Sequence, residues 1–172
     1  MKKTFVIASL LLFCDLLNAQ VSLKALQMYF PDSVNSEKAA KYFFNETQTI
    51  KENAAPVLLG YKAMSYFMMC NYSSDPLTKL GYFNEGKKLL GNAIEKESKN
   101  PELIYFRFST QLNTPKILNY KNELNTDKAF LLEYLENNSS PSNSNKTLNS
   151  RIKEILIQSK LCSKDEIHKM ND

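Results

Sequence analysis

Only a few side chains in this chain are of the types used in acid–base catalysis, and their spacing does not bring them together. His168 is the single histidine among the 172 residues and lies close to the end of the sequence. A general base needs a positioned partner within hydrogen-bond reach, and we expect His168 to be a surface residue. Glu95 and Glu97 point to different faces of one helix, and Glu133 and Glu136 flank a solvated helix end. Neither pair lies among apolar residues that would raise a carboxyl pKa for acid catalysis. The sequence therefore predicts no catalytic residues, and we expect that the protein is not an enzyme.

Three cysteines occur in the chain, and two of them, Cys70 and Cys162, lie beyond the N-terminal apolar run. An oxidising compartment would permit a disulfide between them, which in the chain-entropy model stabilises by roughly 4–5 kcal/mol for a loop of that length. Alternatively, Cys70 is a buried thiol that packs as a small apolar side chain beside Met68 and Met69. Two cysteines and one histidine are too few for a structural zinc site, which takes four ligands. We expect neither a metal nor a cofactor.

The glycines Gly81, Gly86 and Gly91 are spaced five apart within one helical pattern. A phosphate-binding loop instead places its glycines in a turn between a strand and a helix. Close packing of two helices explains these glycines better than phosphate binding does.

The basic residues are almost all lysines, since Arg107 and Arg151 are the only two arginines. The formal net charge is +4, and the lysines are scattered among glutamates along the helix faces. Proteins that bind nucleic acids rely on arginine forks and clustered basic patches. The sequence therefore predicts a solvated surface and no nucleic-acid partner.

The N-terminal residues 1–19 have the layout of a secretory signal peptide. Lys2 and Lys3 precede an apolar run of about ten residues, and the small Ala19 precedes Gln20. The run is shorter than the roughly 20 residues of a membrane span, and no later segment is both long enough and free of charge. We expect cleavage after Ala19, export to the periplasm or the extracellular space, and no transmembrane segment in the mature chain. The alternative is a lipoprotein anchored through Cys14, although Phe13 stands where the bacterial lipobox has a small residue.

Cleavage would remove two lysines and one aspartate, leaving 20 basic and 17 acidic side chains and a net charge of +3. About 150 residues would then remain, which fits one domain with a real core.

Apolar residues recur at steps of three and four along the mature chain, and no alternating strand pattern of useful length occurs. We therefore predict an all-α fold, with about six to seven helices in an irregular stack of antiparallel hairpins. Residues 20–136 form the helical-hairpin domain, 137–147 an Asn- and Ser-rich loop, and 148–172 C-terminal helices that pack on the same domain. The expected elements are helices at 20–30 (ending at Pro31), 36–51 (capped by Ser36), 56–72, 76–98, 101–113, 126–136 and 148–161, a turn at 115–118, and a short helix begun by a capping box of Ser163 and Glu166.

The most informative stretch is the pair of helices at 56–72 and 76–98. One stripe of the second helix is expected to face the first, with Gly86 at the contact and Leu90 and Ala93 buried beside it. The stripe comprises Leu77, Leu80, Phe83, Gly86, Leu90, Ala93, Ile94 and Glu97.

Part of this stretch resembles a tetratricopeptide repeat. The second helix of that repeat resembles the segment with Gly86, Leu90 and Ala93, and the entry to the next helix resembles Asn100-Pro101-Glu102. The Gly and Tyr of the first helix of the repeat resemble the pair Gly60 and Tyr61. The match spans one repeat of about 45 residues against the usual 34. The resemblance therefore implies the hairpin geometry of the superfamily and not a regular array.

The whole chain is also similar to small exported helical proteins of Bacteroidetes that carry a hairpin rich in lysine, tyrosine and asparagine. Asp32-Ser33-Val34 resembles the short O-glycan acceptor of exported Bacteroidetes proteins. This resemblance makes Ser33 a possible modification site.

Tyrosine and arginine are the residue types that most often anchor interfaces. The helices expected to pack together carry Tyr61, Tyr82, Tyr105 and Arg107, which we take as the candidate interaction surface. Because helical-hairpin stacks usually present concave surfaces to peptides or proteins, we expect a non-catalytic interaction or scaffold module with a protein or peptide partner. A carrier of a small apolar ligand is the alternative, and a hydrolytic enzyme is a weaker one.

Overall fold

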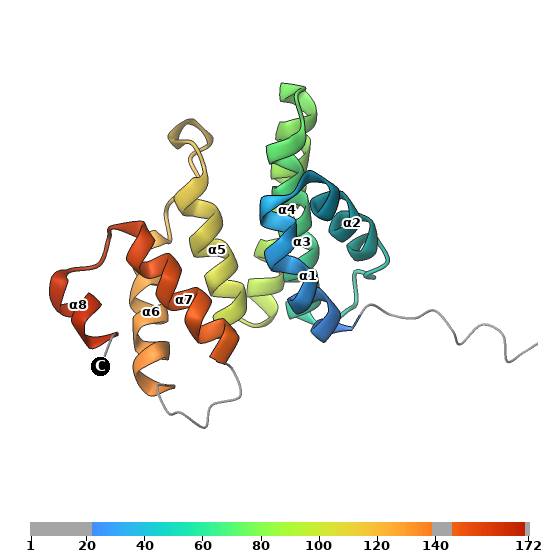
Figure 1. The fold of residues 1–172 in the computed structure, drawn as a ribbon. Coiled ribbons are helices and arrows are strands. Elements are labelled where there is room, and N and C mark those ends of the chain that lie inside the picture. The colour runs from blue at the N-terminus through green and yellow to red at the C-terminus, as the bar shows by residue number, and fades with distance from the viewer. Residues whose placement is uncertain (1–21, 139–145, 171–172) are drawn as a thin grey trace, which may run out of the picture.

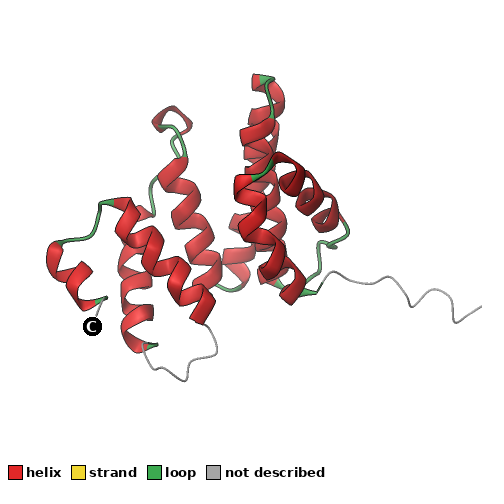
Figure 2. Ribbon diagram, in the orientation of Figure 1, coloured by secondary structure: helices red, strands yellow, loops and turns green. Residues whose placement is uncertain are grey.

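The computed structural model describes residues 22–138 and 146–170, and these residues contain helices but no strands (Figures 1 and 2). The all-α prediction is confirmed, with eight α-helices and one 3-10 turn within the described ranges. In chain order they are α1 (Leu23–Asn35), α2 (Glu37–Gln48), α3 (Pro56–Tyr72), α4 (Pro76–Lys96), α5 (Pro101–Asn113), the 3-10 turn η2 (Lys116–Leu118), α6 (Leu124–Asn137), α7 (Lys146–Ser159) and α8 (Lys164–Lys169).

Short-range capping sets most of the helix starts. The Asp75 side chain accepts a hydrogen bond from the Thr78 backbone N–H, and Asn100 accepts from two backbone N–H groups of α5. Each of these caps precedes a proline in the first turn, where the missing N–H has no helical partner to lose. Ser163 and Glu166 form the expected capping box at the start of α8. These predicted helix starts are therefore confirmed.

The prediction that the first helix ends at Pro31 is wrong, because α1 continues through Pro31 to Asn35. A proline inside a helix lacks the N–H that would bond the carbonyl four residues earlier. Tertiary contacts hold the following turn in place. The Ser33 hydroxyl lies 2.6 Å from the Phe30 carbonyl oxygen and 2.9 Å from the sulfur of Met68 on α3. Pro31 itself faces solvent.

Helices α3 and α4 form the expected antiparallel hairpin and approach closely at Gly86. A Cβ atom at Gly86 would lie 3.0 Å from the Phe67 ring and 3.1 Å from the Ala63 carbonyl oxygen, so a side chain there would need these neighbours to move by a few tenths of an ångström. Leu90 and Ala93 are fully buried, as predicted.

The predicted stripe of α4 is wrong at its first turns. Leu77 is 79% exposed and Leu80 is 42% exposed, while Glu97 at the other end faces solvent. The stripe is buried only from Phe83 to Ile94, where α4 lies against its neighbours.

The helices gather into two groups that stand side by side (Figure 1). Helices α1 to α4 form one group and α5 to α8 the other, and α5 contacts both α3 and α4. The main core lies where the groups meet, around edge-to-face contacts between aromatic rings. Tyr61 and Phe106 have ring centroids 4.9 Å apart, and Phe30 lies 5.7 Å from Tyr61.

Polar contacts join the helices of the second group. Arg107 of α5 donates two hydrogen bonds to Asp127 of α6, at 2.6 and 2.8 Å. Lys128 of α6 pairs with Glu166 of α8 at 2.9 Å. Three residues of α7 belong to the same buried core cluster as Leu26 of α1 and Phe43 of α2, and they are Leu148, Ile152 and Leu156.

Residues 1–19, with the predicted signal peptide and Cys14, lie outside the described residues, as does most of the predicted 137–147 loop. Within the described ranges, no helix combines the length and apolar character needed to cross a bilayer.

Candidate functional site: a groove between four helices

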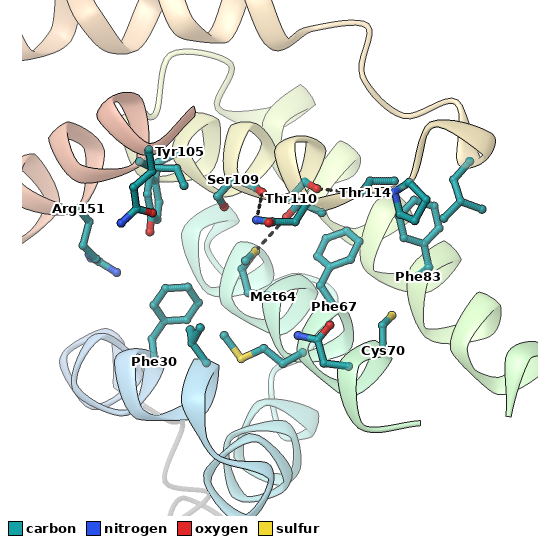
Figure 3. A pocket seen from close by; sticks show the side chains of 18 of the residues that line it. Phe30, Met64, Phe67, Cys70, Phe83, Tyr105, Ser109, Thr110, Thr114 and Arg151 are labelled. Carbon is teal, nitrogen blue, oxygen red and sulfur yellow. Dashed lines mark hydrogen bonds between the residues drawn. The ribbon is translucent and has the colours of Figure 1, made fainter. Parts of the chain in front are cut away.

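A groove of about 750 Å³ opens between the two groups of helices (Figure 3). Four helices, α1, α3, α5 and α7, supply most of its lining, and α4 and the η2 region complete one end. Tyr105 and Arg151 lie toward one end in the view, and Phe83 and Thr114 toward the other. The groove is a feature of the described residues that could receive a ligand or a partner.

The floor of the groove is apolar and rich in methionine and phenylalanine. Methionine is unbranched and flexible, so a methionine-rich surface adapts to differently shaped apolar partners. The floor residues come from α1, α3 and α4 and are Phe30, Met64, Phe67, Met68 and Phe83.

Helix α5 forms a wall whose polar groups are already bonded within their own helix. The hydroxyls of Ser109 and Thr110 both donate to the Phe106 carbonyl oxygen, at 3.0 and 2.8 Å. The Asn113 amide donates to the Ser109 carbonyl oxygen at 2.9 Å, and Thr114 donates to that of Thr110 at 2.8 Å. This wall has few donors left for a polar ligand.

Helix α7, which contacts α5, contributes Arg151, Glu154 and Gln158 to the lining. The Gln158 side-chain amide donates to the Glu154 carboxylate at 2.9 Å. These two polar side chains are four residues apart and form a hydrogen bond along one turn of the helix.

A buried polar network closes the Arg151 end of the groove. Glu102 of α5 accepts hydrogen bonds from the Tyr61 hydroxyl and, at 3.0 Å, from Arg151. Burial, together with the nearby Glu102 carboxylate, raises the pKa of Tyr61 above the ordinary tyrosine value, so the phenol stays protonated and donates. The network joins α3, α5 and α7 behind the groove.

The Arg151 guanidinium is held largely by aromatic rings. It lies 5.6 Å from the ring centroids of both Phe30 and Tyr105. Its Nε and one terminal nitrogen are buried without a hydrogen-bond partner. The ring faces attract the cation and offset part of the free energy lost by burying these two nitrogens without hydrogen bonds.

The Cys70 thiol lines the other end of the groove and is half-buried. Burial raises the pKa of Cys70 to about 11, so the group is a neutral thiol at physiological pH and a poor nucleophile. Burial also raises the pKa of Cys162. Both cysteines are free in the structure, so the possible disulfide between Cys70 and Cys162 is absent from it.

The four residues predicted as one interaction surface lie in different places. Tyr61 is fully buried, so its assignment to a surface is wrong. Tyr82 packs against Phe44 at a centroid distance of 5.7 Å, on the α2 side of the hairpin. Arg107 points to α6 and is bound by Asp127. Only Tyr105 lines the groove.

The possible O-glycan acceptor Ser33 is also fully buried, so the structure contradicts its assignment as a modification site. A glycosyl group needs an exposed hydroxyl, whereas Ser33 faces α3. In α1, Ser33 lies on the same buried face as Leu26 and Phe30.

The residues once considered for catalysis stay at the surface. His168, Glu95 and Glu133 are exposed, and none of them lines the groove. The described part of the chain contains no cluster of three or more His, Cys, Asp or Glu side chains that could hold a metal ion.

Sequence reasoning missed most of the groove, including Phe30, Val34, Met64 and Arg151. One feature of the sequence indicated that the helix at 56–72 lies among several other helices. The segment 56–72 is apolar on nearly every side, and a helix of that kind must contact more than two neighbours. In the structure, α3 contacts α1, α2, α4 and α5.

Comparisons of the chain with protein-family models, with curated proteins and with solved structures find no match. The resemblances to the tetratricopeptide superfamily and to exported proteins of Bacteroidetes stay predictions.

Proposed function

We propose that this protein is an exported, non-catalytic helical module that binds a segment of another protein in the groove between α1, α3, α5 and α7. The groove itself is the observation that supports the proposal. Its floor is apolar and adaptable, and the polar groups of its α5 wall bond within their own helix. Such a lining favours an apolar partner surface over a polar substrate.

Exposed apolar side chains at the rim support a macromolecular partner. Val34 lines the groove and is 51% exposed, and Ile117 beside the lining residue Leu118 is 91% exposed. Removing such side chains from water stabilises a complex by about 25 cal/mol per Å² of apolar surface before the costs of association. A partner larger than the groove would cover both residues.

Site-specific photo-cross-linking in the native host tests the proposal. p-Benzoylphenylalanine is placed at Val34, and a control is placed at Met28 on the same helix, which is 63% exposed and does not line the groove. We expect a discrete cross-linked protein from position 34 and none from position 28. That protein is then identified by mass spectrometry and purified for titration.

The titration decides the outcome. Val34→Asp puts a charge against an apolar surface and is expected to weaken binding by about tenfold or more, while Met28→Asp leaves it unchanged. Equal affinity of both variants, or equal cross-linking from both positions, contradicts the proposed groove.

A carrier of a small apolar ligand is the second candidate, and the groove volume favours it. About 750 Å³ falls within the roughly 300–1,000 Å³ of small-molecule pockets. Native mass spectrometry of protein purified from the host would reveal a bound small molecule, and its loss in Val34→Asp would place it in the groove.

The exported location in the proposal rests on residues 1–19. The mature protein is expected to begin at Gln20 and to stay in solution without detergent, which N-terminal sequencing and intact mass measure. A diacylglyceryl mass on Cys14 would support the lipoprotein instead, and retention of residues 1–19 would contradict export by cleavage.

A further inference from the structure

We infer that the groove receives one amphipathic helix of a partner protein, with carboxylates at the end that meets Lys79 and Lys116. This inference rests on the proposed function and adds the secondary structure and the charge of the bound segment.

The backbone of the groove walls favours a helix over an extended segment. The walls formed by α1, α3, α5 and α7 are helical, so most of their backbone N–H and C=O groups are bonded within the walls themselves. An extended segment needs backbone partners, as in strand addition. On the α5 wall, the side chains of Ser109, Thr110 and Asn113 already donate to carbonyls of α5. A helix satisfies its own backbone and needs only apolar contact.

The spacing of the lining residues matches helix packing. Phe30 and Val34 are four apart on α1, and Tyr105, Ser109 and Asn113 are each four apart on α5. Rows with this spacing form the ridges and grooves between which another helix packs. Residues 105 to 113 span about 12 Å of α5, which corresponds to two turns of a bound helix.

The charges at the end of the groove away from Arg151 determine which end of the bound helix is expected to carry carboxylates. Lys79 lines the groove there, and its carbonyl oxygen accepts from the Cys70 thiol. Lys116 lies in η2 between the lining residues Pro115 and Leu118. Both lysines are exposed, and neither is in an ion pair within the described ranges. Exposed cations attract carboxylates of a partner, and separately they favour the negative C-terminal end of a helix dipole.

A phage-displayed library of random peptides, each about 16 residues long and so able to form about four helical turns, tests the inference. Selection uses the purified protein with Cys162→Ser. The rate of maleimide labelling of Cys70, which is slow even in the free protein, is compared with and without peptide and reports occupancy of the groove. We expect enriched peptides with apolar residues at i, i+3, i+4 and i+7 and with Asp or Glu near the C-terminal end. These peptides become helical by circular dichroism on binding and protect Cys70.

Charge reversal gives the sharper readout. The double variant Lys79→Glu/Lys116→Glu is expected to lose about fivefold or more in affinity for the acidic peptides at low salt, and less at high salt. Peptides whose acidic residues are replaced by lysine should regain affinity for this variant. The control Lys96→Glu/Lys99→Glu changes the net charge equally at exposed positions that do not line the groove and should bind like wild type.

The outcomes separate the two proposals. The inference is overturned, and the proposed function is kept, by peptides that protect Cys70 but stay extended. The same holds for peptides whose affinity is unchanged by Lys79→Glu/Lys116→Glu. Peptides that bind without protecting Cys70 and without sensitivity to Val34→Asp overturn both. No enrichment also overturns the inference, and a small apolar molecule found in the groove would then replace the proposed function with the carrier.

Discussion

Arg151 of α7 donates a hydrogen bond to Glu102 of α5 at 3.0 Å, and this ion pair lies beneath one end of the groove with only 14% and 8% of the two side chains exposed. The same carboxylate accepts from Tyr61 of α3, so one buried charge joins three helices that belong to both groups. This contact therefore connects α3 on one side of the groove with α5 and α7 on the other.

Breaking this pair on one side should destabilise the protein strongly. Arg151→Met leaves the Glu102 carboxylate buried without its cation and is expected to lower the free energy of unfolding by about 3–5 kcal/mol. Adding Glu102→Gln removes the uncompensated charge, so the double variant should recover part of the loss. Urea denaturation followed by circular dichroism measures four proteins: the wild type, Arg151→Met, Glu102→Gln and the double variant. If the loss of unfolding free energy in the double variant equals the sum of the losses in the two single variants, the side chains of Arg151 and Glu102 do not stabilise each other.

Two glycines of α4 should respond to alanine in opposite directions. At Gly86 the added methyl meets Phe67 and the Ala63 carbonyl, so Gly86→Ala should destabilise, and the larger Gly86→Leu should cost roughly 1–3 kcal/mol. At Gly91 an added Cβ has no neighbour within 4 Å, and Gly91→Ala should stabilise by about 0.5–1 kcal/mol. Thermal melts compare the variants. A Gly86→Leu protein that melts at the wild-type temperature would contradict the close approach of α3 and α4.

The Asp75 cap should make the start of α4 sensitive to acid. Hydrogen bonds from the Thr78 hydroxyl and backbone N–H lower the pKa of Asp75 below its usual value. A lowered folded-state pKa adds stability above the unfolded pKa of about 3.9, and this stability is lost as the pH falls through the folded value. Asp75→Ala should therefore lower Tm at pH 7 and lower it less at pH 3. The control Asp75→Asn keeps a capping side chain that does not titrate. If Asp75→Ala lowers Tm by the same amount at pH 7 and at pH 3, the carboxylate is not the cause of the acid sensitivity.

The Cys70 thiol should react slowly near neutral pH. Because burial raises the pKa of Cys70 to about 11, the fraction of thiolate at pH 7–8 is far below that of a free cysteine with a pKa of about 8.5. In Cys162→Ser, iodoacetamide should alkylate the native protein much more slowly than the urea-unfolded protein, and the native rate should still be rising at pH 10. Equal rates in the native and unfolded states would show that Cys70 is not shielded.

Local signals in the sequence predicted the helical class and most helix boundaries. A cap such as Asp75 or Ser163 acts on backbone groups two or three residues away, so its effect can be read from the residues themselves. The close approach at Gly86 was also predictable, because a small residue within an apolar stripe favours helix contact. Pro31 shows the limit of such reasoning, since the turn after it is held by Met68 on another helix.

Tertiary structure alone decided which faces became core and which became groove. Tyr61 and Tyr105 were equal candidates in the sequence, but Tyr61 is buried against Phe106 and Glu102 while Tyr105 lines the groove. The partners that decide this are distant along the chain, because Glu102 bonds Arg151 across 49 positions and Tyr61 across 41. Helical periodicity reports that a face is apolar. What covers that face depends on helices whose approach no local pattern encodes.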